Sequence, residues 1–392
     1  MKYHNEIQGK LENFWKKIKL ILTLHNSLRY HKVLTSPQEV GIEVTNSCNL
    51  QCIMCDKWKW IKKDKRLGGN LTTQKLKSIF DEAAKIGVKS IILTGGEPTL
   101  RKDFCELIEY LSHLNFNIAI TTNGTYITSK MRELLIKNNV KVFFSLHGSY
   151  AELCDKLEGK SGTFKKVIKN IRDFISTKKK YKDTRCKVAI RCVVQKENVS
   201  DLASLFKLAD KLGVDMVTYT IVHGRSRARL NEKCIQLLYG SFIKIKKIIS
   251  TTNIDVVFHP HLLLLLTGHL NVKDIKQGLP SLSLFRSKPV PCLASYISTF
   301  IDAFGNVYPC PYASLPTYSY YPHLHARRYF CLGNINEESL SEIWYGKKYD
   351  EFRREVDAID INKFPFSIVC GHCENYYFFK RTYQYVKLLS FL

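Results

Sequence analysis

Two hydrophobic periodicities alternate between residues 40 and 250. Short runs rich in β-branched residues predict six strands, at 40–45, 90–94, 117–122, 141–146, 186–194 and 214–221. The other segments have a helical period, which predicts helices at 72–86, 102–114, 128–138, 163–177, 199–212 and 231–250. Alternating strands and helices are typical of parallel βαβ units. We therefore expect an α/β fold, either a doubly wound sheet or a barrel, whose functional groups lie beyond the carboxyl ends of the strands.

The segments on either side of this region have different patterns. Residues 1–39 contain an amphipathic helix, which we expect to dock on the main domain; peripheral contact with a membrane surface is the alternative. Residues 251–291 form a bridging region, in which 254–259 is predicted to be a further strand. From 292 to 375 the content of Pro, Tyr, Cys and Gly increases, which predicts a small loop-rich module with a helix around 339–357. An aromatic tail follows at 376–392.

Composition and charge narrow the function classes. The chain has 392 residues, of which 45% are hydrophobic and 24% charged, as in globular proteins. No apolar run approaches the ~18 residues of a membrane span, and the first residues lack the apolar core of a secretion signal, so we expect a cytoplasmic protein. Lys and Arg outnumber Asp and Glu by 60 to 35. These basic residues are scattered in short pieces, which favours a lysine-biased surface over a nucleic-acid site, with an acidic partner or an anionic membrane face as the alternative.

Three of the 13 cysteines come directly after the first predicted strand. Cys48, Cys52 and Cys55 have the spacing C-x3-C-x2-C, which favours metal ligation over disulfide formation in a chain without a secretion signal. A structural zinc site requires a fourth ligand, and no other Cys or His lies close in the sequence. A 4Fe–4S cluster held by three thiolates instead leaves one iron without a protein ligand. That open iron can bind a cofactor or a substrate.

This loop, with Met54 before its last cysteine, resembles the signature of the radical S-adenosylmethionine (SAM) superfamily. Gly95, Gly96 and Glu97, which follow the second strand, resemble the GGE motif of the same family. The resemblance implies a partial (β/α)6 TIM-like barrel over residues 40–250. It also implies that SAM chelates the open iron and that the reduced cluster donates one electron to the sulfonium. The products are methionine and a 5′-deoxyadenosyl radical, which abstracts a hydrogen atom from a C–H bond.

The resemblance also implies cofactor contacts. The GGE motif is expected to bind the amino group of SAM. Ser145, at the end of the fourth strand, matches a position that often contacts the ribose hydroxyls or the carboxylate, and Arg191 on the fifth strand is expected to do the same. The candidates for a catalytic acid or base, which the sequence does not rank, are His147, Tyr219, His223 and Arg225.

A second set of cysteines falls in the C-terminal region. Cys292 and Cys310, the latter at the end of a G-x4-C pattern, are followed by the pair Cys370 and Cys373. This set resembles the SPASM and Twitch modules that bind auxiliary iron–sulfur clusters in radical SAM enzymes. Because no cysteine follows Cys373, we expect the Twitch arrangement, in which these four thiolates hold one auxiliary 4Fe–4S cluster. Zinc in this module is the alternative, and Cys331 is expected to be a packing residue.

These features predict a radical SAM enzyme, an oxidoreductase or maturase that acts on a C–H bond of a peptide or of a natural-product intermediate. Its electrons are expected to come from a reductant such as flavodoxin or ferredoxin. Two alternatives stay open. One is a two-electron alcohol dehydrogenation of a small molecule, in which the auxiliary cluster accepts the second electron. The other is a non-catalytic zinc-binding protein.

Overall fold

A computed structural model describes residues 22–24, 26–27, 30, 32–55, 57–59, 70–221, 230–258, 262, 292, 294–314 and 330–357. These residues include the first three cysteines, the GGE motif, Cys292 and Cys310. Most of the predicted N-terminal helix, most of the bridging region and the aromatic tail lie outside the described residues. The same holds for His223, Arg225, Cys370 and Cys373.

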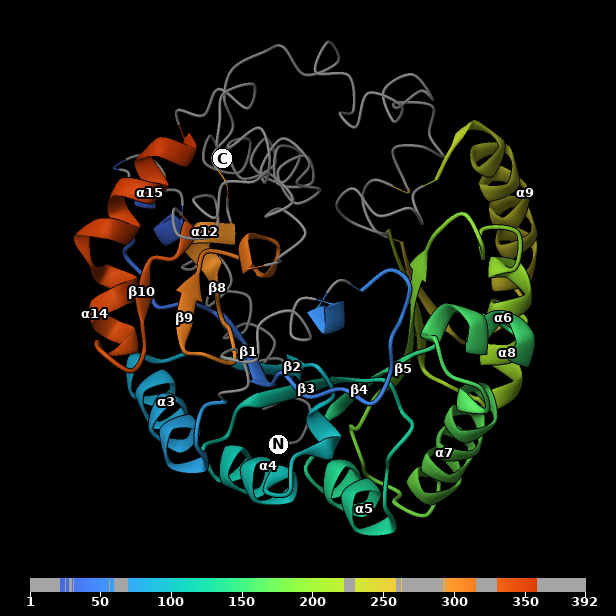
Figure 1. Cartoon of the computed structure of the whole chain (residues 1–392). Helices are drawn as coiled ribbons and strands as arrows, with labels where there is room; N and C mark the ends of the chain where they lie inside the picture. Colours follow the sequence, from blue (N-terminus) through green and yellow to red (C-terminus); the bar gives the residue numbers. More distant parts are fainter. Residues whose placement is uncertain are drawn as a thin grey trace, which may run out of the picture.

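The described strands form one ten-stranded sheet, in the order β10-β9-β8-β1-β2-β3-β4-β5-β6-β7. Neighbouring strands are parallel from β8 through β1 to β7, whereas β9 is antiparallel to both β8 and β10. Figure 1 shows the strands along an open arc with the helices on its outer side. The strands are β1 (Glu39–Thr45), β2 (Ser90–Gly95), β3 (Asn117–Thr122), β4 (Lys141–Ser145), β5 (Val188–Val194), β6 (Met216–Ile221), β7 (Asp255–Phe258), β8 (Ser298–Ile301), β9 (Asn306–Tyr308) and β10 (Gly333–Asn334).

This arrangement confirms the predicted α/β partial barrel. A doubly wound sheet would carry helices on both faces, whereas the labelled helices that connect β1 to β7 follow the outer side of the arc (Figure 1). The predicted strand at 254–259 corresponds to β7. The connecting helices are α3 (Thr73–Ile86), α4 (Phe104–His113), α5 (Ser129–Lys137), α6 (Ala151–Glu158), α7 (Thr163–Lys178), α8 (Leu202–Leu212) and α9 (Glu232–Ile249), with a short 3-10 helix η2 (Pro98–Leu100) after β2.

Local capping explains why some of these helices begin where the sequence predicts. The side chains of Thr72 and Thr128 accept backbone hydrogen bonds at the starts of α3 and α5. Helix α6 was not predicted. It is only eight residues long, and Tyr150 at its N-cap makes no side-chain capping bond, so the sequence carries no start signal for it.

The C-terminal module contains α12 (Ala294–Ile297), η4 (Pro311–Ser314), α14 (Leu340–Tyr345) and α15 (Lys347–Asp357). The helical pattern expected around 339–357 is confirmed, and Gly346, whose backbone is extended, divides it into α14 and α15. A Cβ atom at Gly346 would lie 2.4 Å from Glu342 O, so this break favours glycine. Throughout the described part of the chain, no helix combines the length and apolarity needed to cross a membrane.

The two faces of the barrel strands differ in character. On β1, Val40, Ile42 and Val44 belong to the buried core between the sheet and the helices. The residues that alternate with them lie on the inner face. There, Glu43 Oε2 forms an ion pair with Lys57 Nζ at 2.5 Å, and both side chains are half-buried. On β1 the inner face is therefore polar where the outer face is apolar.

The C-terminal module extends the barrel sheet. Strand β8 pairs with β1 in parallel, and Gly41 on β1 lies opposite Phe300 on β8. Helix α14 adds two polar contacts: Trp344 Nε1 donates to Thr35 O (2.8 Å), and the backbone N–H at the start of α14 donates to Glu82 Oε2 (2.6 Å). The module and the barrel thus share backbone hydrogen bonds, a sheet and side-chain contacts.

Substituting Gly41 tests this junction. A Cβ atom at Gly41 would lie 2.8 Å from the Phe300 ring, so we expect Gly41→Ala to lower the free energy of unfolding by about 1–3 kcal/mol. Gly240→Ala is the matched control, because Gly240 lies in α9 with open space around it; it should stabilise the protein by roughly 0.5–1 kcal/mol. Thermal unfolding compares the two variants. Equal stability of Gly41→Ala and the wild type would contradict the tight packing of β8 on β1.

Candidate active site

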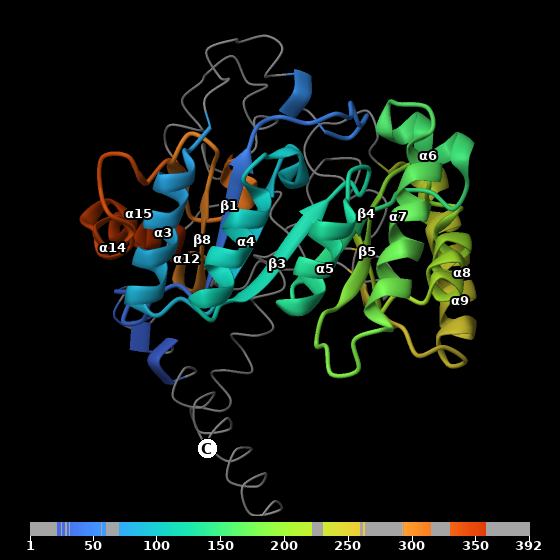
Figure 2. The same cartoon turned by 90° about the horizontal axis from the view of Figure 1, so that it is seen from below.

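The segment after β1 carries the first three cysteines. Figure 2 shows it along the upper edge of the sheet, running from the end of β1 toward α6. Two backbone hydrogen bonds hold it on the last turn of α6: Gln51 N donates to Glu158 O (3.2 Å), and Ile53 N donates to Leu157 O (2.9 Å). Gly159 ends α6 with a φ of +68°, and a Cβ atom there would lie 2.6 Å from Gln51 O. Helix α6 therefore supports the cysteine loop.

The three thiols differ in exposure and influence one another. Cys48 and Cys55 are exposed, and Cys52 is half-buried. Burial raises the pKa of the Cys52 thiol, and the negative charges of Cys55, Glu158 and Cys48 raise it further. Burial also raises the pKa of Cys48. Without a bound cation these thiols favour the protonated form, whereas a metal centre favours the thiolates.

The chemistry of this donor set fits an iron–sulfur cluster. Among the described residues, no three His, Cys, Asp or Glu side chains gather closely enough to hold a single metal ion. In a 4Fe–4S cluster each thiolate ligates a different iron, so the ligand sulfurs lie farther apart than around one ion. The three thiols lie on one loop and two of them are exposed, so they are available as ligands of such a cluster.

The glycines of the GGE motif allow β2 to end directly against the cysteine loop. Gly96 N donates to Thr45 O, and Glu97 N donates to Ser47 O, both at 2.7 Å. Gly95 has a φ of +138°, and a Cβ atom there would lie 2.3 Å from Thr45 O. A Cβ atom at Gly96 would lie 2.2 Å from Ser47 O. Any larger residue would therefore separate the two loops.

The Glu97 side chain points into the protein. Its Oε1 accepts hydrogen bonds from Thr99 N (3.1 Å), Thr99 Oγ1 (2.7 Å) and Thr122 Oγ1 (2.7 Å), and its Oε2 accepts one from Asn123 N (2.5 Å). Burial raises the pKa of Glu97, while these hydrogen bonds lower it. The carboxylate joins the ends of β2 and β3. The partly exposed members of the motif are Gly95 and Gly96.

The structure brings Ser145 and Arg191 together on the inner face. They are register partners on β4 and β5, and both are half-buried. Arg191 Nη1 donates to Thr121 Oγ1 (3.1 Å), and the guanidinium lies 4.1 Å from the centre of the Phe143 ring. These contacts fix the arginine side chain on the inner face at the middle of β5, near the carboxyl ends of β3 and β4.

Two of the candidates for a catalytic acid or base, His147 and Tyr219, are buried within the protein. His147 is buried, its Nδ1 accepts a hydrogen bond from Val193 N (3.2 Å), and burial lowers its pKa to about 4. Tyr219 is fully buried, donates its hydroxyl hydrogen to Leu202 O (2.8 Å) and stacks on Phe258. Neither side chain is placed to exchange protons with a substrate.

Cys292 and Cys310 lie on either side of the β8–β9 hairpin in the sequence. Cys310 follows β9 by two residues, and Cys292 precedes α12, the helix that leads into β8. Burial raises the pKa of Tyr349, and the negative charges of Cys310 and Cys292 raise it further, which places both thiols near this ring.

Buried Arg353 ties the elements around these cysteines together. Its Nε donates to Ser295 O (3.0 Å), and its Nη1 donates to Trp344 O (3.0 Å) and Asp350 Oδ1 (2.8 Å). The guanidinium also lies 4.0 Å from the centre of the Tyr349 ring. Ser295 N and Ser295 Oγ in turn both donate to the backbone carbonyl of Cys292. Arg353 therefore fixes the start of α12 and the segment before it.

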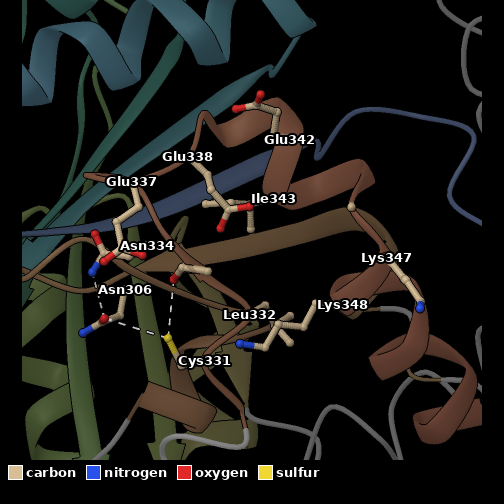
Figure 3. Close-up of a pocket in the computed structure, with 12 residues that line it drawn as sticks. Asn306, Cys331, Leu332, Asn334, Glu337, Glu338, Glu342, Ile343, Lys347 and Lys348 are labelled. Carbon is tan, nitrogen blue, oxygen red and sulfur yellow. Dashed lines mark hydrogen bonds between the residues drawn. The ribbon is translucent and has the colours of Figure 1, made fainter.

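A separate cavity of about 470 Å³ lies beside β10 and α14 (Figure 3). Cys331 opens into it, and its Sγ donates to Gly333 O (3.4 Å). Acidic and basic side chains also line the cavity: Glu337, Glu338, Glu342, Lys347 and Lys348. None of the predicted cluster ligands or SAM contacts belongs to this lining.

Comparison with known proteins identifies two domains. The radical SAM superfamily model matches residues 42–209, and the SPASM iron–sulfur cluster-binding domain matches residues 292–374. The AdoMet-dependent heme synthase of Methanosarcina barkeri is 25% identical over 86% of this chain and 89% of its own length. The mycofactocin maturase MftC of Mycobacterium tuberculosis is 26% identical over 89% of this chain and 78% of its own.

The fold agrees with these matches. Streptococcus suis SuiB, in a crystal structure with bound SAM, superposes with a TM-score of 0.61 over 86% of this chain and 71% of SuiB, at 19% identity. The superfamily and SPASM matches imply a 4Fe–4S cluster, SAM and one or more auxiliary iron–sulfur clusters. The chain therefore carries a radical SAM domain, which is followed by a SPASM-type iron–sulfur cluster-binding domain.

Proposed function

We propose that this enzyme cleaves SAM reductively at a cluster held by Cys48, Cys52 and Cys55, and that the resulting radical abstracts hydrogen from a C–H bond. The observation that carries this proposal is the direct attachment of the cysteine loop to the GGE turn by two backbone hydrogen bonds of 2.7 Å. A cluster on the first loop and a cofactor on the second would therefore be neighbours. Family membership leaves the non-catalytic zinc-binding alternative without support.

The residues available to bind SAM lie on the same edge of the barrel. Gly95 and Gly96 offer backbone groups, since the Glu97 carboxylate is occupied within the protein. Arg191 offers a guanidinium for the SAM carboxylate, and its contacts with Thr121 and Phe143 hold it in place. Ser145 offers a hydroxyl for the carboxylate or the ribose. When bound, the cluster supplies the electron that breaks the C–S bond.

We further propose one auxiliary 4Fe–4S cluster, held by Cys292, Cys310, Cys370 and Cys373. Its support is that the first two thiols flank the β8–β9 hairpin in the sequence and that both influence Tyr349. The last two lie outside the described residues. Four thiolates would leave no iron open, so this cluster would serve electron transfer or structure.

The substrate we propose is a peptide or a natural-product intermediate. The similarity to a mycofactocin maturase and the fold shared with SuiB, which was crystallised with a precursor peptide, support this choice. The polar inner face of β1 supports it as well, because the Glu43–Lys57 ion pair is suited to a hydrogen-bonding substrate. We propose flavodoxin or ferredoxin as the reductant. A reduced cluster and free thiolates require a reducing compartment, which fits a cytoplasmic location.

Counting iron tests the cluster assignment. Anaerobic reconstitution with iron and sulfide should give about eight irons per chain, as expected for two 4Fe–4S clusters. Changing all of Cys48, Cys52 and Cys55 to Ala should leave about four. The same triple variant should form no 5′-deoxyadenosine when SAM and dithionite are added. About twelve irons in the wild type would refute one auxiliary cluster, and 5′-deoxyadenosine formation by the triple variant would refute the proposed mechanism.

Gly96→Ala tests the junction of the two loops. The new Cβ would approach Ser47 O to 2.2 Å, so the loops must separate, and we expect weaker SAM binding and lower iron content. Gly162→Ala is the control: Gly162 has a φ of +77° but no atom within 4 Å of the added Cβ, so it carries backbone strain of about 1 kcal/mol without a clash. Equilibrium dialysis with SAM and iron analysis compare the variants. Equal losses in both variants would contradict the proposed junction, because Gly162 lies outside it.

A further inference from the structure

Asn123 lies where the cysteine loop, the GGE turn and the end of β3 meet. Its backbone N–H donates to Glu97 Oε2 (2.5 Å). Its side-chain Nδ2 donates to Asn49 Oδ1 at 2.9 Å and to Cys48 Sγ at 3.9 Å. One residue thus touches both a predicted cluster ligand and the buried acid of the GGE motif.

The hydrogen-bond network fixes which end of the Asn123 amide faces the sulfur. Its Oδ1 accepts hydrogen bonds from Thr125 N (2.9 Å) and Thr125 Oγ1 (2.7 Å). Asn49 Nδ2 donates to the same Thr125 hydroxyl (2.9 Å), which turns Asn49 Oδ1 toward Asn123. If the Asn123 amide were flipped, its NH2 group would face the N–H donor of Thr125, and its oxygen would face the acceptor Asn49 Oδ1. Both contacts would be unfavourable. The N–H group therefore points at Cys48.

A donor at this sulfur affects the electronic state of a cluster. Reduction adds negative charge to the cluster and its thiolates, and a hydrogen bond to a thiolate stabilises that charge. Donors to ligand sulfurs consequently raise the reduction potential. The Asn123 amide N–H acts on the Cys48 sulfur in this sense, because it is directed at Sγ.

We propose that Asn123 is a positioning residue that sets the reduction potential of the radical SAM cluster through its hydrogen bond to Cys48 Sγ. This proposal rests on the proposed function, in which Cys48 is a cluster ligand. Glu97 holds Asn123 in place from the side of the GGE turn, so the turn that adjoins the cofactor site also orients a donor to the cluster.

The test is a redox titration of the full-length, reconstituted protein, followed by electron paramagnetic resonance. The signal of the radical SAM cluster is identified as the one that changes when SAM is added and that is absent from the variant without Cys48, Cys52 and Cys55. Asn123→Ala should lower the midpoint potential of this signal. Asn123→Asp should lower it further, because it keeps the acceptor for Thr125 but replaces the donor with a negative charge.

Asn170→Ala is the matched control. Asn170 Nδ2 donates to Gly124 O (2.7 Å), so this variant loosens the same turn without touching a sulfur, and its potential should equal that of the wild type. An unchanged potential in both Asn123 variants would overturn the proposal. So would loss of iron from both Asn123 variants beside a normally loaded Asn170→Ala, since Asn123 would then only hold the loop. A wild-type protein without any SAM-responsive signal would instead refute the proposed function.

Discussion

Two backbone hydrogen bonds between the ends of β1 and β2 determine the geometry of this active site. Gly96 N and Glu97 N reach Thr45 O and Ser47 O at 2.7 Å, which brings the GGE turn into contact with the cysteine loop. The approach is possible because neither Gly95 nor Gly96 has a Cβ atom. On the opposite side, α6 holds the same loop through Gln51 and Ile53. The loop is thus fixed from two directions before any cluster binds.

In this arrangement, the residues of the GGE motif have structural roles that their residue types alone do not indicate. The glycines make room for neighbouring backbone, and the acid joins β2 to β3 from within the protein. The polar groups available for a ligand on the inner face come from the strands after β2. One of them is Arg191, which Thr121 and Phe143 hold in place. In the proposed function, the binding and orientation of SAM are therefore distributed over β2 to β5, while the cysteine loop would supply the metal ligands.

Local patterns in the sequence predicted much of the fold. The strand at 117–122 agrees with β3 at both ends, and the other barrel strands differ by at most two residues, because each is a short β-branched run bounded by turns. Helix α6 was missed because it is short and lacks a capping side chain. The pairing of β8 with β1 was also missed, since it joins residues that are some 260 positions apart and depends on the fit of Phe300 over Gly41. The burial of Glu97 required knowledge of β3, which supplies two of its donors.

The central claim is that one iron of the first cluster has no protein ligand and binds SAM. Electron–nuclear double resonance on the reduced protein, with SAM labelled by ¹⁵N at its amino group, tests this claim most directly. The account predicts a ¹⁵N coupling at the signal that disappears when Cys48, Cys52 and Cys55 are replaced. A spectrum without this coupling at saturating SAM, or with a protein nitrogen or fourth cysteine on that iron, would contradict it.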